Sequence, residues 1–368
     1  MKFFVTAPLG VERALARELG RLGFERKRPV PGGVELSGRF EDAYRVCLES
    51  RLAQRVLAPQ IVAPCASERE LYAIAREVRW EEHMSPDTTI AVSAVGTAPG
   101  LDNTMFVAQR TKDAIVDRLR EVFGARPSVD RRDPDVSVFA RLAKGQLTLS
   151  LDLSGESLHR RGYREPGAEA PLKESLAAAL IVLADWDAKC PLVDPMCGSG
   201  TLAIEADGLA RRVAPGLARG RFGFERWTSF DRARKKRWQI LTDRARAAER
   251  KSGPRILAFD ADRRAVELAK QSVRRAGAHV EVARRDVAEL VGTTPPGLVI
   301  VNPPYGERLA GGRELYARLG GALAALPPGH RVALLLGPDV PFQPPKHATR
   351  HRVRNGDLPC VLAVWDVE

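Results

Sequence analysis

The apolar positions of the first 155 residues change repeatedly between a spacing of two and a spacing near 3.6, which are the spacings of strands and helices. Phe3–Pro8 is typical of a strand, and Val11–Leu22 carries apolar residues at helical spacing before a glycine. Further on, Val136–Ala143 and Gln146–Leu153 alternate with period two around a Lys-Gly pair, which predicts a hairpin. Short strands mixed with helices indicate an α+β module in this part of the chain.

Two helix starts in this module are marked by residues that cap helices. Ser67 is followed three residues later by Glu70, the pattern of a capping box, and an apolar helical stretch comes after it. Asn103 or Thr104 precedes a second helical segment, Phe106–Phe123. The sequence therefore predicts that both helices begin at these polar residues.

The pattern changes after Arg160–Ala170, a polar segment broken by glycine and proline that is typical of a linker. Beyond it, short apolar strands alternate with helical segments, and the strands include Pro191–Val193, Arg255–Phe259 and Gly297–Val301. Regular alternation of strands and helices predicts a parallel α/β sheet. The predicted fold class is thus a Rossmann-like α/β sheet preceded by an α+β module.

Several classes of protein are disfavoured by composition. The longest apolar run, Leu176–Ala184, is half of the roughly 18 residues that a membrane-spanning helix needs. The five cysteines are scattered and form no C-x-x-C pair, which argues against a disulfide framework and against structural zinc. We expect a cytoplasmic protein without a membrane partner or a bound metal.

Charge gives the first indication of a partner. Lysine and arginine number 58 against 46 aspartate and glutamate, a net charge of +12 that suits a polyanion such as nucleic acid. Arginine-rich composition alone also produces basic proteins that bind no nucleic acid, so both interpretations remain open on charge alone.

A glycine-rich turn is the strongest local motif. Leu192-Val193-Asp194 reads as a strand, and Gly198-x-Gly200-x-x-Ala203 follows it at the start of a helix, a pattern that lets a ligand approach the backbone. Asp194 would repel a diphosphate placed nearby, whereas it would favour the cationic ammonium and sulfonium groups of S-adenosylmethionine. A tight turn without any ligand is the alternative.

Two further acids follow later strands. Asp260 ends the strand Arg255–Phe259 and can accept hydrogen bonds from ribose hydroxyls, although it lies about 60 residues after the glycines instead of about 20. An Arg-rich insertion, Arg211–Gly253, accounts for the difference; it is either a solvated helical face or a surface that contacts phosphates. Asp286 is a candidate acceptor for an adenine amine, or an ordinary loop aspartate.

The most informative motif is Asn302-Pro303-Pro304-Tyr305, which follows an apolar strand. The two prolines end the strand in a rigid turn that offers an amide oxygen, a carbonyl oxygen and an aromatic ring. A planar base stacked on Tyr305 could donate its exocyclic amine to Asn302 and Pro303, which would orient the amine lone pair toward a methyl donor. An ordinary strand-ending turn is the alternative.

Taken together, these motifs resemble a known family. DPMCGSGT, FDAD, RRD and NPPY occur in the order seen in class I S-adenosylmethionine-dependent methyltransferases that act on an exocyclic amine. With TMFVAQRTKDAIVDRLR, LSLDLSGESLHRRGYR and APLKESLAAALI, the chain resembles bacterial THUMP-containing ribosomal RNA guanine-N2-methyltransferases. The resemblance implies a ferredoxin-like part at 1–55, a THUMP RNA-binding domain at 56–158 and a class I methyltransferase domain at 159–368.

The resemblance also assigns roles to single residues. It implies that Asp194, Gly198 and Gly200 hold the methionine end of the cofactor, Asp260 its ribose and Asp286 its adenine. It places Asn302, Pro303 and Tyr305 on the target base, with Pro304 completing the turn. The remaining members of the predicted cofactor turn are Pro195, Cys197 and Thr201.

The leading hypothesis is therefore methylation of the N2 amine of a guanosine in 23S ribosomal RNA. A tRNA guanine-N2-methyltransferase is the nearest alternative, and an adenine-N6 DNA enzyme does not account for the N-terminal module. A nicotinamide dehydrogenase would explain the glycines but neither Asp194 nor the turn at Asn302. A non-catalytic RNA chaperone with an inactive cofactor pocket is the alternative of a different class.

Overall fold

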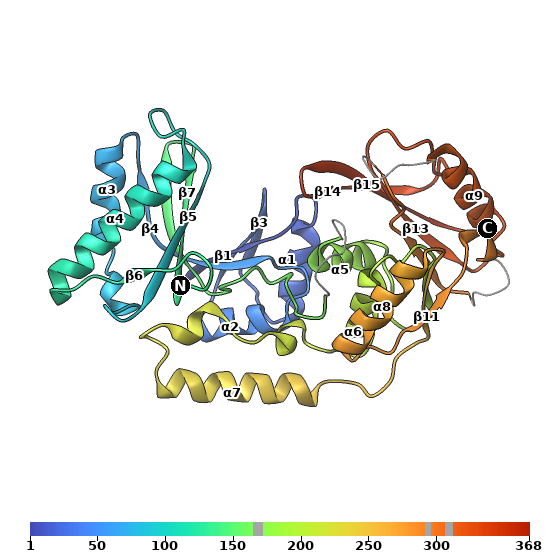
Figure 1. The fold of residues 1–368 in the computed structure, drawn as a ribbon, viewed down its shortest axis with the longest axis horizontal. Coiled ribbons are helices and arrows are strands. Elements are labelled where there is room, and N and C mark those ends of the chain that lie inside the picture. Colours follow the sequence, from blue (N-terminus) through green and yellow to red (C-terminus); the bar gives the residue numbers. More distant parts are fainter. Residues whose placement is uncertain (165–171, 291–295, 306–311) are drawn as a thin grey trace.

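The computed structural model describes residues 1–164, 172–290, 296–305 and 312–368. Over these residues the chain builds two sheets, one of eight and one of seven strands, in an elongated molecule (Figure 1). The first half forms a mixed sheet with helices, and the second half forms a largely parallel sheet that alternates with helices. The predicted succession of an α+β module and a parallel α/β sheet is confirmed.

One strand joins the two halves of the N-terminal module. The sheet order is β2-β3-β1-β4-β8-β7-β5-β6, and β4 pairs with β1 on one side and with β8 on the other. The boundary predicted at residue 55 therefore falls on the first residue of a strand that both parts share. The strands are β1 (Lys2–Thr6), β2 (Lys27–Val30), β3 (Gly33–Ser37), β4 (Arg55–Pro64), β5 (Thr89–Val95), β6 (Ser128–Val129), β7 (Val136–Ala143) and β8 (Gln146–Asp152).

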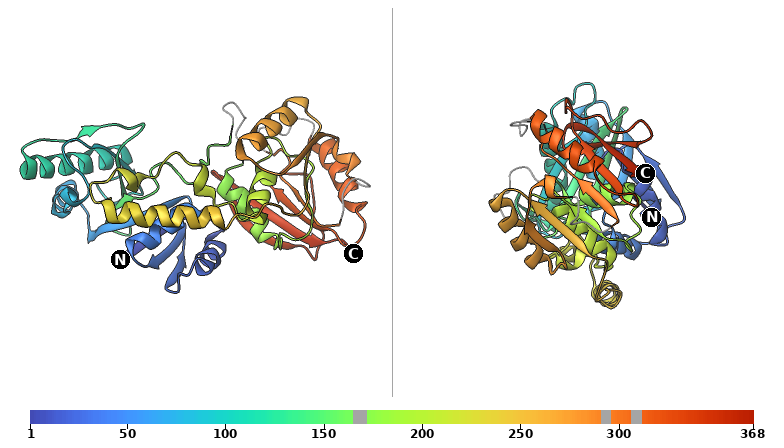
Figure 2. Two further views of the ribbon diagram at one scale, coloured as in Figure 1. Left: turned by 90° about the horizontal axis from the view of Figure 1, so that it is seen from below. Right: turned by 90° about the vertical axis from the view of Figure 1, so that its right-hand side faces the viewer.

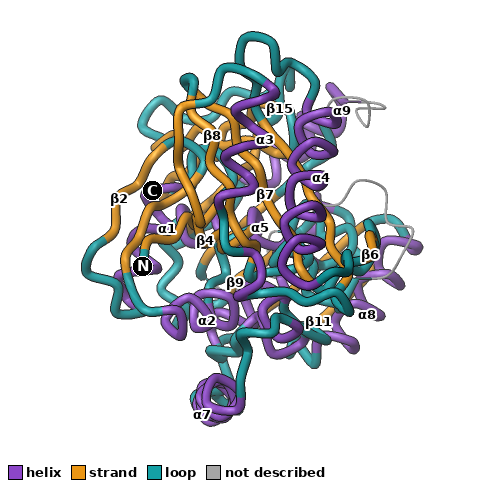
Figure 3. The backbone as a smooth tube through the Cα atoms, turned by 90° about the vertical axis from the view of Figure 1, so that its left-hand side faces the viewer, coloured by secondary structure: helices purple, strands orange, loops and turns teal. Residues whose placement is uncertain are grey.

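The helices of this module begin where the capping residues predict. The Ser67 side chain accepts a hydrogen bond from the backbone of Glu70 at the start of α3, and Asn103 accepts from two backbone N–H groups at the start of α4. The helices α3 and α4 pack together over one face of the sheet (Figure 3). The helical elements are α1 (Glu12–Arg21), α2 (Phe40–Glu49), α3 (Glu68–Glu77), the short 3₁₀ turn η1 (Trp80–Glu82) and α4 (Thr104–Phe123).

The second sheet has the order β11-β10-β9-β12-β13-β15-β14, in which β15 runs antiparallel to its neighbours. Its inner strands are apolar on both faces because α5, α6 and α8 cover one face and α9 covers the other. The elements are α5 (Glu174–Leu183), β9 (Leu192–Asp194), α6 (Thr201–Ala210), β10 (Ile256–Asp260), α8 (Arg263–Ala276), β11 (Glu281–Arg284), η4 (Val287–Glu289), β12 (Leu298–Val301), α9 (Gly312–Ala324), β13 (Arg331–Leu336), β14 (Thr349–Asn355) and β15 (Leu358–Asp366).

The Arg-rich insertion returns to the N-terminal module. It consists of η2 (Pro215–Ala218), η3 (Gly223–Arg226) and α7 (Arg232–Ala247), and α7 lies along α2 (Figure 2). Tyr44 of α2 stacks on Phe224 with ring centroids 4.0 Å apart, and Trp238 of α7 meets Phe224 edge-on at 5.2 Å. Aromatic packing therefore fixes the insertion to the first 55 residues of the chain.

A buried ionic cluster also joins the module to the second sheet. Glu205 of α6 pairs with Arg161 of the linker, accepts a hydrogen bond from the Tyr163 hydroxyl at 2.8 Å, and lies 3.5 Å from Arg51. Arg161 in turn donates to the carbonyl of Arg51 at 2.6 Å. The module, the linker and α6 thus meet at one carboxylate.

Within the described residues, no helix combines the length and the apolar composition that crossing a membrane requires.

Candidate active site

The second sheet has a topological switch point between β9 and β12. From β9, the strands β10 and β11 continue in one direction, whereas β12 and β13 lie in the other. Ligands of such sheets bind outside the carboxyl ends of the strands at this point. The strand β9 ends at Asp194 and β12 ends just before Asn302, and paired strands lie about 4.8 Å apart. The predicted cofactor turn and the predicted amine turn therefore share one edge.

The glycine turn is held in shape by the neighbouring strand β10. The N–H of Cys197 donates to the carbonyl of Phe259 at 2.8 Å, and the N–H of Gly198 donates to Asp260 Oδ2 at 2.9 Å. Gly198 and Gly200 have φ angles of +53° and +78°, which side chains rarely tolerate. A Cβ built on Gly198 would meet no atom within 4 Å, so the turn is open at this residue.

Asp194 is a buried carboxyl group at the end of β9. It is 1% exposed, and Oδ1 accepts a hydrogen bond from the N–H of Met196 at 3.3 Å. Burial raises the pKa of Asp194 to about 8, and the nearby Asp260 adds to this increase. A cation placed beside Asp194 would favour its charged form, so the site fits a ligand that carries a positive group.

Asp260 and Asp286 lie at the ends of β10 and β11, as their positions in the sequence predict. Both oxygens of Asp260 already accept hydrogen bonds, from Gly198 and from the N–H of Asp262 at 3.0 Å. Asp286 caps η4, and its Oδ2 accepts a hydrogen bond from Arg318 at 3.1 Å. Carboxylate oxygens hold more than one hydrogen bond, so each residue retains acceptor capacity while it braces the edge of the site.

The turn after β12 contains an unpaired acceptor. Asn302 Oδ1 is buried, and no described residue donates a hydrogen bond to it. No backbone N–H of the described residues donates to the carbonyl of Pro303, whereas the carbonyl of Pro304 accepts from the Tyr316 hydroxyl at 3.3 Å. Because a buried acceptor without a donor is costly, Asn302 is arranged to receive a donor from outside the described chain.

Tyr305 does not lie as the sequence predicts. Its side chain is 7% exposed, and its hydroxyl accepts a hydrogen bond from Asn355 Nδ2 at 2.7 Å. The ring packs on Gly337, where any Cβ would lie 2.4 Å from the ring carbons. The ring therefore points toward β13 and β14, away from the glycine turn at β9, and the predicted open face for a base is absent in this arrangement.

Three other predicted cofactor residues shape the turn without offering it free polar groups. Pro195 is buried. Cys197 is buried as well, and burial, with the nearby Asp194, raises the pKa of its thiol well above the usual value. Thr201 Oγ1 accepts a hydrogen bond from Arg164 at 3.4 Å. All eight predicted cofactor residues thus lie on the carboxyl edge of the sheet, but only some of them present groups to a ligand.

Sequence reasoning did not include Glu174 and Arg164 in the site. Glu174 opens α5 and is buried, and burial raises the pKa of its carboxyl group. Arg164 lies 3.6 Å from Glu174 and donates to the carbonyl of Leu172 at 2.6 Å, so it is held beside the start of α5. The burial of Glu174 could have been predicted from the uniformly apolar sequence of α5, which indicates that even the first turn of this helix is buried.

No metal site is visible in the part of the chain that the structure describes: no group of three or more His, Cys, Asp or Glu side chains there is arranged to hold an ion.

Comparison with known protein families matches three successive parts of the chain. Residues 2–57 match the RlmL ferredoxin-like domain, residues 65–152 the THUMP domain, and residues 161–334 the RMKL-like methyltransferase domain. These matches, with the strand order of the second sheet, confirm the predicted fold: a ferredoxin-like and THUMP module followed by a class I methyltransferase domain.

Similar proteins agree with these matches. The chain is 42% identical over 385 residues to the ribosomal RNA large subunit methyltransferase K/L of Allochromatium vinosum, and 42% identical over 386 residues to that of Syntrophotalea carbinolica. All of this chain aligns, but it spans about half the length of these relatives, 52% and 54%.

Solved structures show the same architecture. A putative methyltransferase, SMU.472, complexed with SAH has a TM-score of 0.85 at 28% identity, and a possible methylase from Clostridium difficile 630 has 0.87 at 28%. Each comparison covers 100% of this chain and 98% of the other.

Proposed function

The chain belongs to the THUMP-containing family of class I ribosomal RNA methyltransferases, and from that premise we propose that it methylates the N2 amine of a guanosine in 23S ribosomal RNA with S-adenosylmethionine as donor. The observation that carries the proposal is the buried, unpaired Asn302 Oδ1 on the same sheet edge as the buried Asp194. Asn302 Oδ1 can accept a hydrogen bond from a donor such as an amine, and Asp194 favours a ligand that carries a positive charge.

The predicted residues fit the cofactor. Asp194 would take its cationic methionine end, the open turn at Gly198 would admit it to the backbone, and Asp260 and Asp286 would accept hydrogen bonds from ribose and adenine. The cofactor supplies an electrophilic methyl group when it is bound. The chain supplies the cradle, which β10 braces through the hydrogen bonds to Cys197 and Gly198.

Asn302 and Pro303 would position the guanine amine. Asn302 Oδ1 and the Pro303 carbonyl would each accept one of its two N–H bonds, which directs the amine lone pair away from both oxygens. Such positioning lowers the barrier by replacing a random encounter with a fixed approach. Neither oxygen is a strong base, so the proton leaves the amine after the new bond forms.

Tyr305 acts in this proposal as a positioning residue. Its hydrogen bond to Asn355 and its packing on Gly337 anchor the end of the Asn-Pro-Pro turn to β13 and β14. Pro304 is anchored similarly through Tyr316 of α9. The two anchors fix the direction in which Asn302 and Pro303 present their oxygens.

The shape of the molecule supports a polymeric substrate. The THUMP part and the second sheet lie toward opposite ends of the elongated chain (Figure 1). A substrate that uses both must be longer than a nucleoside, and its target base must leave its stack to reach a turn at a sheet edge. An RNA in the cytoplasm of a bacterium, where ribosomes are assembled, meets these requirements.

The proposal is tested by incubating the protein with 23S ribosomal RNA transcripts and methyl-labelled S-adenosylmethionine, followed by nuclease digestion and mass spectrometry. We expect N2-methylguanosine at one position. Transfer to tRNA alone would favour the alternative substrate. Cofactor binding without transfer to either RNA would support the RNA chaperone instead.

A further inference from the structure

A large cleft in the described residues lies away from the candidate active site, between the THUMP part and the insertion. Its volume is about 1150 Å³. Its walls include the strand β5, the first turns of α4, residues within 129–139 and 152–162, and residues 218–223 of the insertion. Pockets for small ligands measure roughly 300–1000 Å³, so this cleft has room for an extended molecule.

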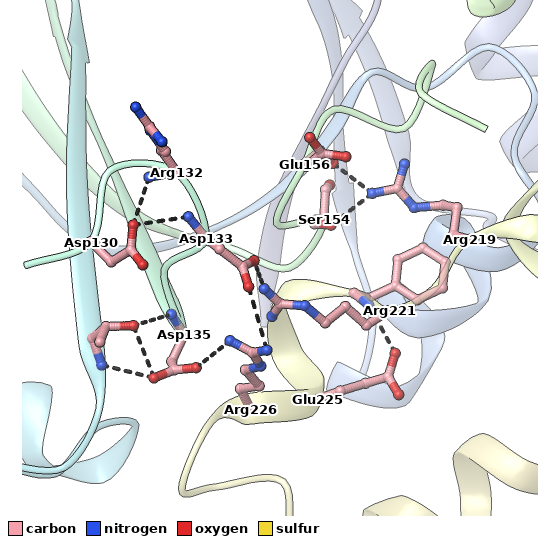
Figure 4. A network of polar contacts seen from close by, with 12 residues as sticks. Asp130, Arg132, Asp133, Asp135, Ser154, Glu156, Arg219, Arg221, Glu225 and Arg226 are labelled. Carbon is pink, nitrogen blue, oxygen red and sulfur yellow. Dashed lines mark hydrogen bonds and ion pairs between the residues drawn. The ribbon is translucent and has the colours of Figure 1, made fainter. Parts of the chain in front are cut away.

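One wall contains the loop 130–135, which joins β6 to β7. Asp130 Oδ1 accepts hydrogen bonds from the N–H groups of Arg132 at 2.8 Å and Asp133 at 3.1 Å (Figure 4). A carboxylate that bonds two successive backbone N–H groups fixes the conformation of a tight turn. The side chains of Arg131 and Arg132 are therefore presented from a shaped loop.

The insertion neutralises the other two acids of this loop. Arg221 forms an ion pair with Asp133, and Arg226 pairs with Asp135 at 2.7 Å and with Asp133 at 3.5 Å (Figure 4). Without the insertion, the loop would carry three carboxylates against two guanidinium groups. With both ion pairs formed, Asp133 and Asp135 are occupied by cations of the insertion.

Arg131 and Arg132 consequently remain available to a ligand. Both are exposed, both line the cleft, and neither has an ion-pair or hydrogen-bond partner for its guanidinium group among the described residues. These two cations of the loop can therefore pair with a ligand without first breaking a contact to a described residue.

The insertion also orders the opposite wall. Arg219 donates hydrogen bonds to the carbonyls of Ser154 at 3.3 Å, Glu156 at 2.9 Å, Ser157 at 2.9 Å and Arg160 at 2.7 Å. The segment after β8 is thereby wrapped around a single side chain of the insertion. Both walls of the cleft depend on contacts with the segment 219–226.

Exposed apolar side chains lie among these cations. Met105 at the start of α4 is 74% exposed and Val129 of β6 is 49% exposed, and both line the cleft. Single-stranded RNA is recognised by cations on its phosphates and apolar surfaces under its unstacked bases. A double helix hides its bases and would leave Met105 and Val129 without contacts.

We propose that this cleft binds a single-stranded segment of the RNA substrate, that Arg131 and Arg132 contact its phosphates, and that Arg221 is a positioning residue that keeps Asp133 from opposing them. The inference rests on the proposed function, since it takes RNA as the substrate. It gives the insertion a defined task, which is to build the binding cleft and to neutralise its acids.

The first test compares two basic pairs. The Arg131→Gln/Arg132→Gln variant and the Lys235→Gln/Lys236→Gln variant lose the same charge, but the lysines lie on the exposed face of α7, outside the cleft. Binding of a fluorescein-labelled single-stranded fragment of 23S ribosomal RNA is followed by anisotropy at several salt concentrations. For the arginine variant we expect a Kd about tenfold higher and a salt slope smaller by about 1.4, which corresponds to two phosphate contacts on a single strand.

The lysine variant should bind like the wild type. An unchanged slope for the arginine variant would overturn the proposal, and a loss confined to the lysine variant would place the RNA along α7 instead. Transfer of methyl groups is measured separately. If the wild-type protein binds RNA through Arg131 and Arg132 but methylates nothing, the proposed function is wrong, whereas the proposal that the cleft binds RNA is still supported.

A second test isolates the positioning role. Arg221→Gln should raise the Kd for the same RNA because Asp133 then keeps only its 3.5 Å pair with Arg226, which is shared with Asp135. Adding Asp133→Asn should restore the affinity although the ion pair with Arg221 is still missing. Direct contact between Arg221 and RNA would predict no restoration. That outcome would overturn the positioning role.

Discussion

The two ends of this molecule are built in different ways. At the active-site end, Asp194, Asp260 and Asn302 each follow a strand, and the parallel strands β10, β9 and β12 place them on one edge. At the THUMP end, the cleft depends on pairs such as Arg226 and Asp135, which are 91 positions apart in the sequence. Chemistry that depends on strand ends can be read from consecutive residues, whereas a surface made by distant segments cannot.

A buried junction between the two ends offers the largest test of this comparison. Arg161 is 3% exposed and pairs with the buried Glu205 of α6, whose first turn belongs to the glycine motif. Arg161→Met should lower the free energy of unfolding by about 3–5 kcal/mol because it removes the nearer of the two cations that face the buried Glu205 carboxylate. Denaturant unfolding measures the loss, and both RNA and cofactor binding should weaken in the folded variant.

The matched control for that experiment is Arg28→Met, which removes an exposed ion pair with Glu35. Exposed pairs contribute little, so we expect a change within about 1 kcal/mol. Equal effects of the two variants would mean that the junction does not connect the two ends.

The second test isolates the active-site end. Asn302→Ala should reduce kcat about 100-fold, since it removes one of the two oxygens that orient the amine, and should leave the Kd values for RNA and cofactor unchanged. Single-turnover methyl transfer and calorimetry separate these quantities. Unchanged turnover would remove Asn302 from the mechanism.

The third test concerns the protonation of Asp194. In the free protein its raised pKa favours folding at low pH, and this contribution is lost as the pH rises from the usual 3.8 to about 8. A cationic ligand requires the charged form, so cofactor affinity should fall up to tenfold for each pH unit below 8, with release of a proton on binding.

Calorimetry in buffers of different ionisation enthalpy measures this proton. The Asp194→Asn variant should bind the cofactor weakly and without the proton release. Wild-type binding that does not change between pH 6 and pH 8 would contradict the cationic role of the site.

The smallest effect concerns Tyr305. Tyr305→Phe removes the hydroxyl that accepts from Asn355, which should cost about 1 kcal/mol of stability, while the ring still packs on Gly337. Thermal unfolding and kcat are measured together, and kcat should change less than twofold. A large loss of turnover at full stability would show that the hydroxyl takes part in the reaction.

The sequence predicted the fold and the location of the site better than the orientation of its side chains. The strand-ending acids and the glycine turn do lie on one edge of the sheet, as predicted, because the place of each depends on its neighbours in the chain. The burial of Tyr305 was not predictable, since it depends on β14, an edge strand with the polar sequence TRHRVRN that has no apolar alternation. The sequence favours a solvated first-turn position for Glu174, because its burial depends on the packing of α5 against α6.

The insertion was predicted in extent but not in place. The arginines of the insertion could pair with acidic residues in many parts of the sequence. Only the aromatic packing around Phe224 shows that the insertion lies on the first 55 residues. Composition could not decide between a solvated helix and a functional one for the same reason.

The return of the insertion to the N-terminal module has a consequence for engineering. A fragment restricted to the second sheet, its helices and the insertion would carry Phe224 and Trp238 without Tyr44, and a transplanted N-terminal module would lack Arg219 and Arg221. Neither half can therefore be grafted onto another protein as a self-sufficient module. Swapping target specificity between relatives would require that residues 1–164 and 211–253 travel together.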